Sequence, residues 1–549
     1  MRFRYIDMNR TKVKISRLIS SSVSLPYTTE PSEAYSIVKK KLARALRASV
    51  KNAEYSIYKK SIDARRKDDI RFVYTVAVMF AEPIFGDETS LAKEGFRICP
   101  QKSMDIEFGE EKSPFPPIVV GSGPAGMFCA LLLAENGYRP ILIERGDNIE
   151  KRVSAVNEFF AGKALNCESN VMFGAGGAGT FSDGKLVTRI SDPLCSYVFE
   201  RFCDFGAPSE ITYKAKPHIG TDLLQGIVSK ILARIGECGG EVIYNCRLDS
   251  FAENPDGSVT VSTSKGDMVG SSVVLAIGHS ARDTYKFLNE KNYSLIAKPF
   301  SVGVRIEHLR SDIEKALYGD AAGDPLLGAA EYALSDTSSG RGVYTFCMCP
   351  GGEVIAAASE EGGVVVNGMS HHARDLKNSN AAVAVSVLPE DYDGTPMGAI
   401  EFQRNLERKA FVLGGGNYSA PIELLGDYID SKTKGFKTPS VVMPSYTRSM
   451  TSVTDISAVF PNFVNEELKR GLSSFGKKLQ GFDSPNAVLT AVESRTSSPI
   501  RILRNELGVA LGHSAIYPCG EGAGYAGGIT SAAVDGIKTA LLIMKRFAP

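Results

Sequence analysis

The 549-residue sequence predicts an α/β protein whose largest domain is assembled from separate stretches of chain. Three observations lead to this prediction. A glycine-rich turn between a short apolar strand and a helix begins near Ile118. A second strand, loop and helix begin only near Ile516, after a long stretch with a different pattern. The first 80 residues carry their own strand and helix signals.

The composition excludes several classes of protein. With 43% hydrophobic and 23% charged residues, the chain can bury a large core, which excludes global disorder. The net charge of +1 excludes a uniformly basic nucleic-acid-binding protein, although residues 1–70 alone carry a net charge of +10. No apolar run reaches the about 18 residues needed to cross a bilayer, so we expect no membrane partner.

The ten cysteines are scattered along the chain, and Cys347 and Cys349 are the closest pair. There is no Cys-x-x-Cys motif and no cysteine and histidine spacing typical of zinc sites, so we expect no metal. A chain of this size does not need the disulfides of a small secreted scaffold. We therefore expect reduced thiols and a cytoplasmic protein.

Residues 1–95 are expected to form a small basic α+β domain. Alternating apolar residues predict strands over 12–19, 55–62 and 70–80. Between the first two strands, a helix should begin at Pro31, where the missing N–H costs nothing. Its apolar face has one residue every four: Ala34, Val38, Leu42 and Leu46. This order of elements is typical of a ferredoxin-like domain.

The segment from Ile118 to Glu144 has the pattern of a dinucleotide-binding βαβ unit. A strand runs into Gly121-Ser122-Gly123-Pro124-Ala125-Gly126, a helix follows, and a second strand ends at Glu144. The glycines would allow a tight turn, the approach of a pyrophosphate to the backbone, and close packing of helix on strand. The helix N-terminus favours an anion, and Glu144 would accept hydrogen bonds from a ribose. An ordinary βαβ turn without a ligand is the alternative, which the matched context disfavours.

Later segments favour FAD over NAD as the nucleotide. Residues 172–185 are glycine-rich and too long for a simple turn, and a strand over 273–275 ends in a turn of small residues. Near the C-terminus, residues 516–522 form a strand that enters a loop at Glu521, and a helix then opens at Gly527-Gly528. A second strand, acid and helix N-terminus would hold the far half of a long cofactor. NAD needs no such second set of contacts, whereas FAD does.

These segments resemble the flavoproteins of the glutathione reductase fold, and more closely the family of uncharacterised FAD-dependent (NAD(FAD)-utilising) dehydrogenases. The resemblance covers nearly the whole chain from about residue 12 and includes residues 216–222, 301–308, 345–352, 366–370, 493–499 and 520–528. It implies FAD as the cofactor, with Glu521 in place of the Asp that usually binds the ribityl chain. It also implies that Gly528 and Ile529 present N–H groups to the flavin. It implies no particular reaction.

The expected fold is therefore a three-layer, Rossmann-like FAD-binding domain made of residues 118–289 and 485–549. Residues 96–117 would link it to the N-terminal domain, and residues 290–484 would form an inserted α+β capping domain over the substrate pocket. The expected cofactor-binding residues are Gly121, Ser122, Gly123, Pro124, Ala125, Gly126, Glu144, Arg145, Gly176, Gly177, Thr180, Asp183, Lys185, Leu248, Ala276, Gly278, Gly520, Glu521, Gly527, Gly528 and Ile529.

Four residues are candidates for chemistry beside the flavin. Cys347 and Cys349 would share one face of a strand, where two side chains are poorly placed for an unstrained disulfide, so buried cysteines are favoured over a redox pair. His371 could act as an acid or base, although adjacent histidines are more often structural. Arg495, which three hydroxyl residues follow, could bind an anionic substrate or could belong to a structural turn.

The leading interpretation is an FAD-dependent oxidoreductase, a dehydrogenase or reductase, that acts on a small molecule, with NAD(P)H as one candidate electron donor. The inserted stretch has no glycine motif of its own, so a nicotinamide would have to enter the flavin pocket. A flavin-dependent RNA-modifying enzyme that docks RNA on its basic N-terminal domain is the alternative, and the absence of an aromatic RNP-like run disfavours nucleic acid. A flavoprotein with a purely structural FAD is a second alternative.

Overall fold

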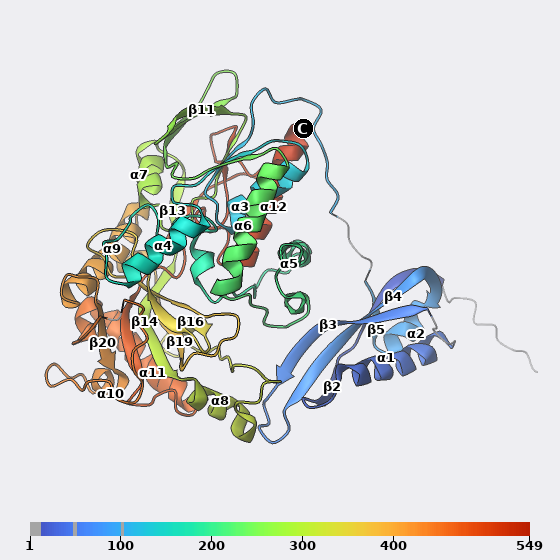
Figure 1. Ribbon diagram of the computed structural model, residues 1–549, viewed down its shortest axis with the longest axis horizontal. Coiled ribbons are helices and arrows are strands. Elements are labelled where there is room, and N and C mark those ends of the chain that lie inside the picture. The colour runs from blue at the N-terminus through green and yellow to red at the C-terminus, as the bar shows by residue number, and fades with distance from the viewer. Residues whose placement is uncertain (1–11, 48–51, 100–103, 449) are drawn as a thin grey trace, which may run out of the picture. The chain divides into compact units, whose positions relative to one another are not determined.

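The computed structural model describes residues 12–47, 52–99, 104–448 and 450–549, which form two compact units (Figure 1). The smaller unit takes in the chain up to Asp105 together with Pro208–Pro217 and Leu317–Gly328, and the larger unit holds the rest. Parts of the expected N-terminal domain (residues 1–11 and 48–51) and of the expected linker (residues 100–103) lie outside the described residues. None of the described helices is long and apolar enough to cross a membrane.

The smaller unit is an antiparallel sheet with two helices. Its elements are β1 (Lys12–Ser20), β2 (Val23–Pro26), α1 (Pro31–Leu46), β3 (Ala53–Asp63), β4 (Arg71–Asp87), α2 (Glu88–Lys93) and β5 (Phe96–Ile98). The strand order is β3, β4, β1, β5, and β2 continues the β1 edge of β4. A βαββαβ chain with this order has the ferredoxin-like topology that the sequence pattern predicts.

Two details of the smaller unit depart from the sequence pattern. Strand β5 lies inside the expected linker 96–117 and pairs with β1, because it supplies the edge strand that closes this side of the sheet. Some of the basic residues that suggested RNA are neutralised locally, since Arg65 pairs with Asp63 and Arg66 with Asp68. Helix α1 buries Ala34, Val38, Leu42 and Ala45, close to the predicted stripe.

A parallel five-stranded sheet forms the centre of the larger unit. Its order is β24 (Ile516–Pro518), β12 (Val273–Leu275), β6 (Ile118–Val120), β7 (Ile141–Ile143) and β8 (Glu241–Ile243). Val273 of β12 pairs with Ile118 on one side and with Ile516 on the other. Segments nearly 400 residues apart thus share one sheet, which confirms the discontinuous assembly.

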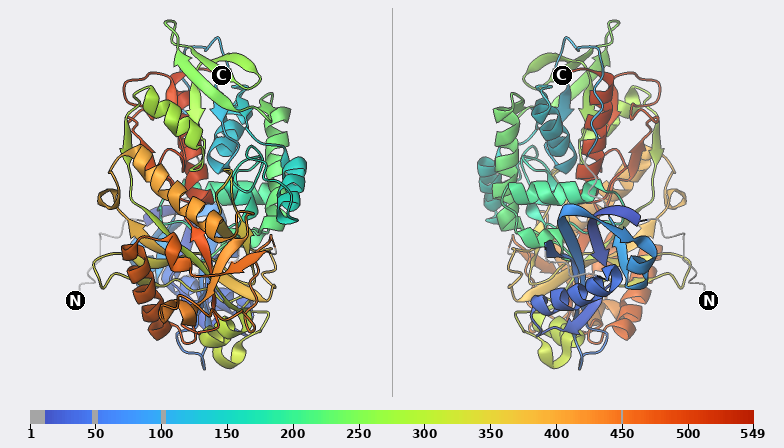
Figure 2. Two further views of the ribbon diagram at one scale, coloured as in Figure 1. Left: turned by 90° about the vertical axis from the view of Figure 1, so that its left-hand side faces the viewer. Right: turned by 90° about the vertical axis from the view of Figure 1, so that its right-hand side faces the viewer.

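Two further layers cover this sheet, as the three-layer prediction requires (Figures 1 and 2). Helices α3 (Pro124–Glu135), α6 (Thr221–Glu237) and α12 (Ile529–Arg546) pack together on one face. An antiparallel sheet of β9 (Leu248–Glu253), β10 (Val259–Thr263) and β11 (Gly266–Gly270) covers the other, where its apolar residues share one core with Ile118 and Ile143. The remaining helices of this part are α4 (Ile149–Phe160), α5 (Leu194–Asp204) and α7 (Arg282–Glu290).

The inserted part of the larger unit is built on a seven-stranded sheet. Its order is β15 (Ser335–Asp336), β16 (Val343–Cys349), β19 (Asn378–Val387), β14 (Phe300–Leu309), β22 (Val488–Glu493), β20 (Ala420–Leu424) and β21 (Thr451–Val453). The other elements are the hairpin β17 (Glu353–Ala356) and β18 (Val366–Met369), and helices α8 (Arg310–Tyr318), α9 (Pro396–Leu413), α10 (Leu425–Ile429) and α11 (Asn462–Lys478). We call this part the cap.

The cap boundaries differ from the expected 290–484. Strand β22 pairs with β14 and β20, so the cap sheet extends to Glu493 instead of ending before residue 485. Strand β13 (Leu295–Ala297) pairs with β23 (Ile500–Ile502) outside the cap sheet, so the sheet begins only at β14. Long-range strand pairing sets both boundaries, and residues distant in sequence supply the partners.

Candidate active site

A cavity of about 320 Å³ lies at the carboxyl ends of the parallel strands of the larger unit. The ends of β6, β7 and β12 contribute Gly121, Glu144 and Ala276 to its wall, and the cap contributes Phe346 and Cys347. Ligands of open α/β sheets bind at this edge, because the loops and helix N-termini that follow the strands converge there.

The first glycine segment, Gly121–Gly126, forms a turn that a larger side chain would block. Gly121 has a φ of +97° and donates its N–H to the Ile143 carbonyl at 2.8 Å. A Cβ on Gly126 would collide with the backbone carbonyl oxygen of Gly121. Gly123 precedes α3 without a side-chain cap, so the first N–H groups of that helix are available to an anion.

Glu144, at the end of β7, joins the first glycine segment to the second. One carboxylate oxygen accepts from the Ser122 N–H (2.9 Å) and hydroxyl (2.7 Å), and the other accepts from the N–H groups of Gly146 and Gly174, both at 3.0 Å. A carboxylate has about four acceptor positions, and protein donors occupy all of them here. The carboxylate therefore ties the cavity wall together, whereas the sequence pattern predicts a ribose acceptor.

The second glycine segment, residues 170–179, is wrapped around a buried cation. Arg152 of α4 is 0% exposed and donates to five backbone carbonyls, those of Asn170, Val171, Gly174, Ala175 and Gly177, at 2.6–3.3 Å. Burial lowers the pKa of Arg152 to about 9, and Glu144 opposes the shift. These bonds hold Gly174 and Gly177 along the cavity. Sequence reasoning missed Arg152, because no local pattern marks a residue whose partners are carbonyl groups about 20 positions away.

The N-terminus of α12 forms a further wall, to which Gly527, Gly528 and Ile529 contribute. Gly528 offers no side-chain cap and the first turn has no acid, so the N–H groups of this turn favour an anion. Glu521 lines the cavity beside them, and burial raises the pKa of Glu521 to about 7. Gly520 lies behind it and donates to Asp535 at 2.7 Å.

A group of four charged side chains borders the cavity near α12. Asp183 is 0% exposed and pairs with Arg374 (2.5 Å) and Lys185 (2.7 Å), and both cations also contact Glu331. Burial alone would raise the pKa of Asp183, but the two cations lower it. Burial alone would lower the pKa of Lys185, but Asp183 raises it. Lys185 is therefore protonated, and the two cations and two acids of the group balance each other in charge.

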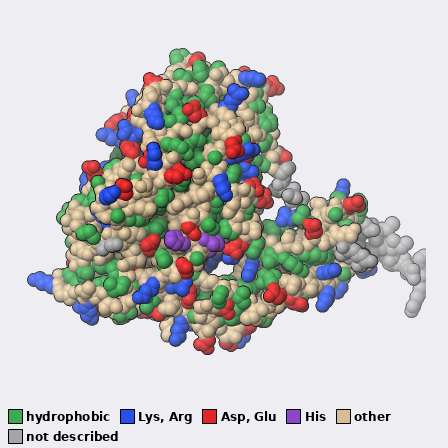
Figure 3. Space-filling model, viewed as in Figure 1, with side chains coloured by type: hydrophobic (Ala, Val, Ile, Leu, Met, Phe, Trp, Pro, Cys, Tyr) green, Lys and Arg blue, Asp and Glu red, His purple; other side chains and the backbone are tan. Residues whose placement is uncertain are grey.

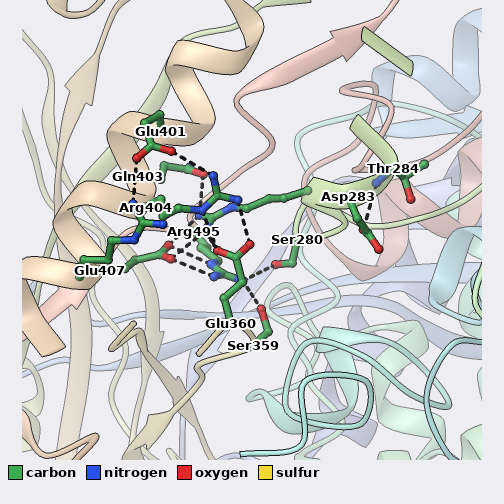
Figure 4. A network of polar contacts seen from close by, with 12 residues as sticks. Ser280, Asp283, Thr284, Ser359, Glu360, Glu401, Gln403, Arg404, Glu407 and Arg495 are labelled. Carbon is green, nitrogen blue, oxygen red and sulfur yellow. Dashed lines mark hydrogen bonds and ion pairs between the residues drawn. The ribbon is translucent and has the colours of Figure 1, made fainter. Parts of the chain in front are cut away.

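Arg495 faces the cavity, but protein groups occupy most of its N–H groups (Figure 4). It donates to both carboxylate oxygens of Glu407 (3.0 and 2.9 Å), to Ser280 (3.0 Å) and to Ser359 (2.5 Å). Glu407 binds Arg282 as well, with both oxygens at 2.8 Å. This network anchors α9 of the cap to the FAD-binding part, and it favours the structural interpretation of Arg495 over substrate binding.

None of the described histidines provides a protonated imidazole at the cavity wall. His279 lines the wall and contacts the Ser280 hydroxyl at 3.0 Å. Burial, with Arg495 and Arg282 nearby, lowers the pKa of His279 to about 3, so the imidazole is neutral. His371, the sequence candidate, is exposed and does not line the cavity.

The cap wall contains Phe346, Cys347, Asn367 and Glu493. Arg305, which is 0% exposed, holds the last three: it donates to the Cys347 carbonyl (2.9 Å), to Asn367 (2.8 Å) and to Glu493 (2.7 Å). The sequence predicts that Cys347 and Cys349 share one face of a regular strand, and this prediction is wrong. The pairing of β16 with β19 shifts register between Phe346 and Cys349.

Most expected cofactor-binding residues line the cavity: Gly121, Gly123, Pro124, Ala125, Glu144, Arg145, Gly177, Asp183, Lys185, Leu248, Ala276, Gly278, Glu521, Gly527, Gly528 and Ile529. Ser122, Gly126, Gly176, Thr180 and Gly520 lie behind this lining and support it. Sequence reasoning missed Phe346, Asn367 and Glu493 as cavity residues. Each lies within a motif on which the family resemblance rests, and that membership is the signal in the sequence that could have identified them.

Comparisons with known proteins match the cap, the nucleotide-binding part and the smaller unit to three separate family models. Residues 299–496 match a family model described as FAD-dependent protein, C-terminal domain-like, and residues 119–179 match an NAD(P)-binding Rossmann-like domain. Residues 22–79 match a domain of unknown function. An uncharacterized protein of Clostridium beijerinckii is 44% identical over 521 residues, which cover 93% of this chain and 96% of that protein.

Solved structures with partial similarity include NikD, described as an unusual amino acid oxidase essential for nikkomycin biosynthesis. It is 11% identical, with a TM-score of 0.33, over 80% of this chain and 96% of its own. Thioredoxin reductase of Lactococcus lactis is 15% identical, with a TM-score of 0.18, over 30% of this chain and 35% of its own. The family matches and the full-length relative show that the chain belongs to the family of FAD-dependent proteins, with FAD as its cofactor.

Proposed function

We propose that FAD lies along the cavity from Glu144 and Leu248, at the adenosine end, to the N-terminus of α12, at the flavin end. The two glycine segments fit a pyrophosphate between these ends. A Cβ on Gly177 would lie 2.9 Å from the Gly123 Cα, so the two backbones can lie this close together only because residue 177 is a glycine. Gly179 approaches Ile529, which connects this point to α12.

We further propose that the protein is an oxidoreductase whose small-molecule substrate enters on the cap side of the cavity. The observation that carries this proposal is the shared lining: one cavity is bounded by the glycine segments and by Phe346, Asn367 and Glu493 of the cap. FAD supplies two-electron transfer when bound. Around it, Arg305 orients Asn367 and Glu493, and the Lys185 ammonium group, held by Asp183, could donate a hydrogen bond to a polar group of the substrate.

NAD(P)H is the electron donor that we propose to test first. The described cap strands are antiparallel except for the β20–β21 pair, so the described cap does not contain a second parallel nucleotide-binding sheet. A nicotinamide would then share this cavity with the substrate, and the two would react with the flavin in turn.

The test is an anaerobic visible spectrum of the purified protein before and after NADH or NADPH. Bleaching by one nucleotide supports a pyridine-nucleotide-linked reductase or dehydrogenase. A flavin spectrum that responds to neither nucleotide but bleaches with dithionite contradicts this choice of donor and leaves a substrate-reduced enzyme. A flavin that resists every reductant contradicts the oxidoreductase proposal and supports a structural FAD.

A further inference from the structure

The cap places two cysteines at the wall of the cavity. Cys347 lines the cavity, and Cys349 is buried directly behind it, with its Sγ 3.3 Å from the Cys347 carbonyl oxygen. The side chain of Cys349 therefore folds back over residue 347. The other cysteine that lines the cavity, Cys246, lies at the adenosine end beside Arg247 and Leu248.

The backbone between the two cysteines is not a regular strand. Phe346 pairs with Ala382 and Cys349 with Asn380, so an extra residue of β16 is inserted between two pairs. Cys347 has a φ of +43°, in the left-handed region. The bulge and the left-handed φ take the two cysteines out of the regular extended geometry of positions i and i+2, on which the objection to a disulfide rests.

Charged groups of both signs lie around the pair: the cations Arg305 and Lys185, and their ion-pair partners Glu493 and Asp183. Arg305 Nη1 donates to the Cys347 carbonyl at 2.9 Å and lies 4.0 Å from Cys349 Sγ, and Lys185 borders the same part of the cavity. A hydrogen bond from the Cys349 thiol, with Arg305 and Lys185, lowers the pKa of Cys347 to about 6, although burial and the Asp183 carboxylate oppose the shift. The pKa of Cys349 is raised by the same hydrogen bond and by burial. By contrast, burial raises the pKa of Cys129 and Cys519.

Shared cavity lining and one hydrogen bond relate the pair to the flavin end of the proposed cofactor site. Thr530, in the first turn of α12, donates to the Leu186 carbonyl at 2.8 Å, and Lys185 precedes Leu186 in the chain. Lys185 and Cys347 both line the cavity. A substrate that reaches the flavin from the cap side therefore passes an accessible thiol with a second thiol behind it.

We propose that Cys347 and Cys349 form a redox-active dithiol that reacts with a small disulfide substrate in this cavity. The inference rests on the proposed function, in which substrates enter on the cap side. The Cys347 thiolate attacks one sulfur of the substrate disulfide, a mixed disulfide forms, and the first substrate thiolate leaves and takes up a proton. Cys349 then loses its proton and attacks Cys347 Sγ, which releases the second substrate thiol. The substrate disulfide is reduced to two thiols, and the protein dithiol is oxidised to a disulfide.

The test uses the FAD-loaded protein, reduced and then freed of reductant, with oxidised glutathione as the probe under anaerobic conditions. We expect the wild-type protein to form a Cys347–Cys349 disulfide and to release reduced glutathione, as read by thiol titration and by mass spectrometry of peptides. Cys349→Ser should stop at a glutathione adduct on Cys347. Cys347→Ser should form neither product. Cys238→Ser, at the end of α6 and outside the cavity lining, should behave as wild type.

A wild-type protein that forms no Cys347–Cys349 disulfide, or a Cys349→Ser variant that traps no adduct on Cys347, would overturn the inference. The visible spectrum of each variant separates this failure from that of the proposed function. If FAD is bound and reducible while the cysteines stay inert, the dithiol is wrong and the oxidoreductase stands. If no FAD is bound, the proposed function itself fails.

The pH dependence of alkylation gives a second, independent readout. The rate of iodoacetamide reaction at Cys347 should have its midpoint near the lowered pKa of about 6, whereas an ordinary cysteine titrates near about 8.5. Lys185→Met should move the midpoint of Cys347 upward, because it removes one of the cations that stabilise the thiolate. A midpoint near 8.5 in the wild-type protein would contradict a thiolate poised for exchange.

Discussion

Different forces shape the two glycine segments that border the cavity. Gly121–Gly126 is a local structure, in which a strand, a turn and a helix follow one another and the helix N-terminus faces the cavity. Residues 170–179 have little regular structure of their own, and Arg152 holds them from behind through five carbonyls. Glu144 bonds to both segments. One wall of this site therefore takes its shape from the local sequence of strand, turn and helix. The other wall takes its shape from a buried arginine that holds the backbone in place.

The largest effect should come from closing the local turn. In Gly126→Val, the side chain meets the Gly121 carbonyl, which cannot move without breaking the turn. We expect the variant to lose stoichiometric FAD, measured as flavin absorbance per protein. Gly226→Ala is the matched control, because Gly226 is also helical and a Cβ there meets nothing within 4 Å. That variant should keep its FAD and gain about 1 kcal/mol of stability. Full FAD occupancy in Gly126→Val would contradict the role of this turn.

The next effect should come from Arg152. Arg152→Met leaves five buried carbonyls without their donor, at a cost of about 3 kcal/mol or more, and should raise the Kd for FAD about 100-fold. Arg152→Lys should recover part of the affinity, because it restores the charge but fewer hydrogen bonds. Lys151→Met, the exposed neighbour on α4, is the control and should leave the Kd unchanged. An unchanged Kd in Arg152→Met, measured by fluorescence titration of FAD, would show that the second segment does not bind the cofactor.

The structure explains why these two segments were not equally predictable from the sequence. Local pattern predicts the first segment, the strands on either side of it, and α12. Periodicity and glycine spacing within 10 to 30 neighbouring residues are enough for these predictions. The second segment was recognised as glycine-rich, but its path depends on Arg152 and Glu144. The sequence predicts a regular strand at Cys347, because the alternation of residues cannot reveal a bulge that arises from the register with β19. Arg495 was ambiguous because its partner, Glu407, lies 88 residues away on α9.

The link between the segments should give an intermediate effect. Glu144→Gln replaces one acceptor oxygen with an amide that faces N–H donors, so up to two of the four hydrogen bonds are lost. We expect the Kd for FAD to rise about 10-fold, and the free energy of unfolding to fall by about 1–3 kcal/mol. Calorimetric titration and thermal unfolding measure the two quantities. Unchanged values for both would show that the four bonds contribute nothing to the wall.

The smallest effect should come from crowding Arg152 without removing it. Gly174 has a φ of +113°, and a Cβ there would press on the Arg152 side chain. Gly162 has a similar φ of +96° but open space around it. Alanine at either position carries the strain of a left-handed backbone, about 1 kcal/mol, so the difference between the variants isolates the contact with Arg152. Gly174→Ala should weaken FAD several-fold and Gly162→Ala should not, and equal Kd values for the two would contradict this account.

The charged surface of the larger unit offers no competing explanation for these effects. On the face drawn in Figure 3, cationic and acidic side chains are interspersed. Some of the charged side chains of the larger unit form ion pairs, as Arg145 does with Glu168 and Asp283. Moderate changes in salt concentration should therefore alter the FAD Kd much less than the substitution of Arg152 does, because the buried guanidinium is shielded from solvent ions.

Hydrogen–deuterium exchange of the FAD-free protein, with and without added FAD, tests the central claim most directly. The claim is that both glycine segments bind one FAD molecule whose far end reaches α12. We expect FAD to slow amide exchange in residues 121–127, in residues 174–185 and in the first turn of α12, while strands β1, β3 and β4 of the smaller unit exchange as before. Protection confined to residues 121–127 would contradict the claim, because it would leave the second segment, and with it the cap-facing cavity, outside the cofactor site.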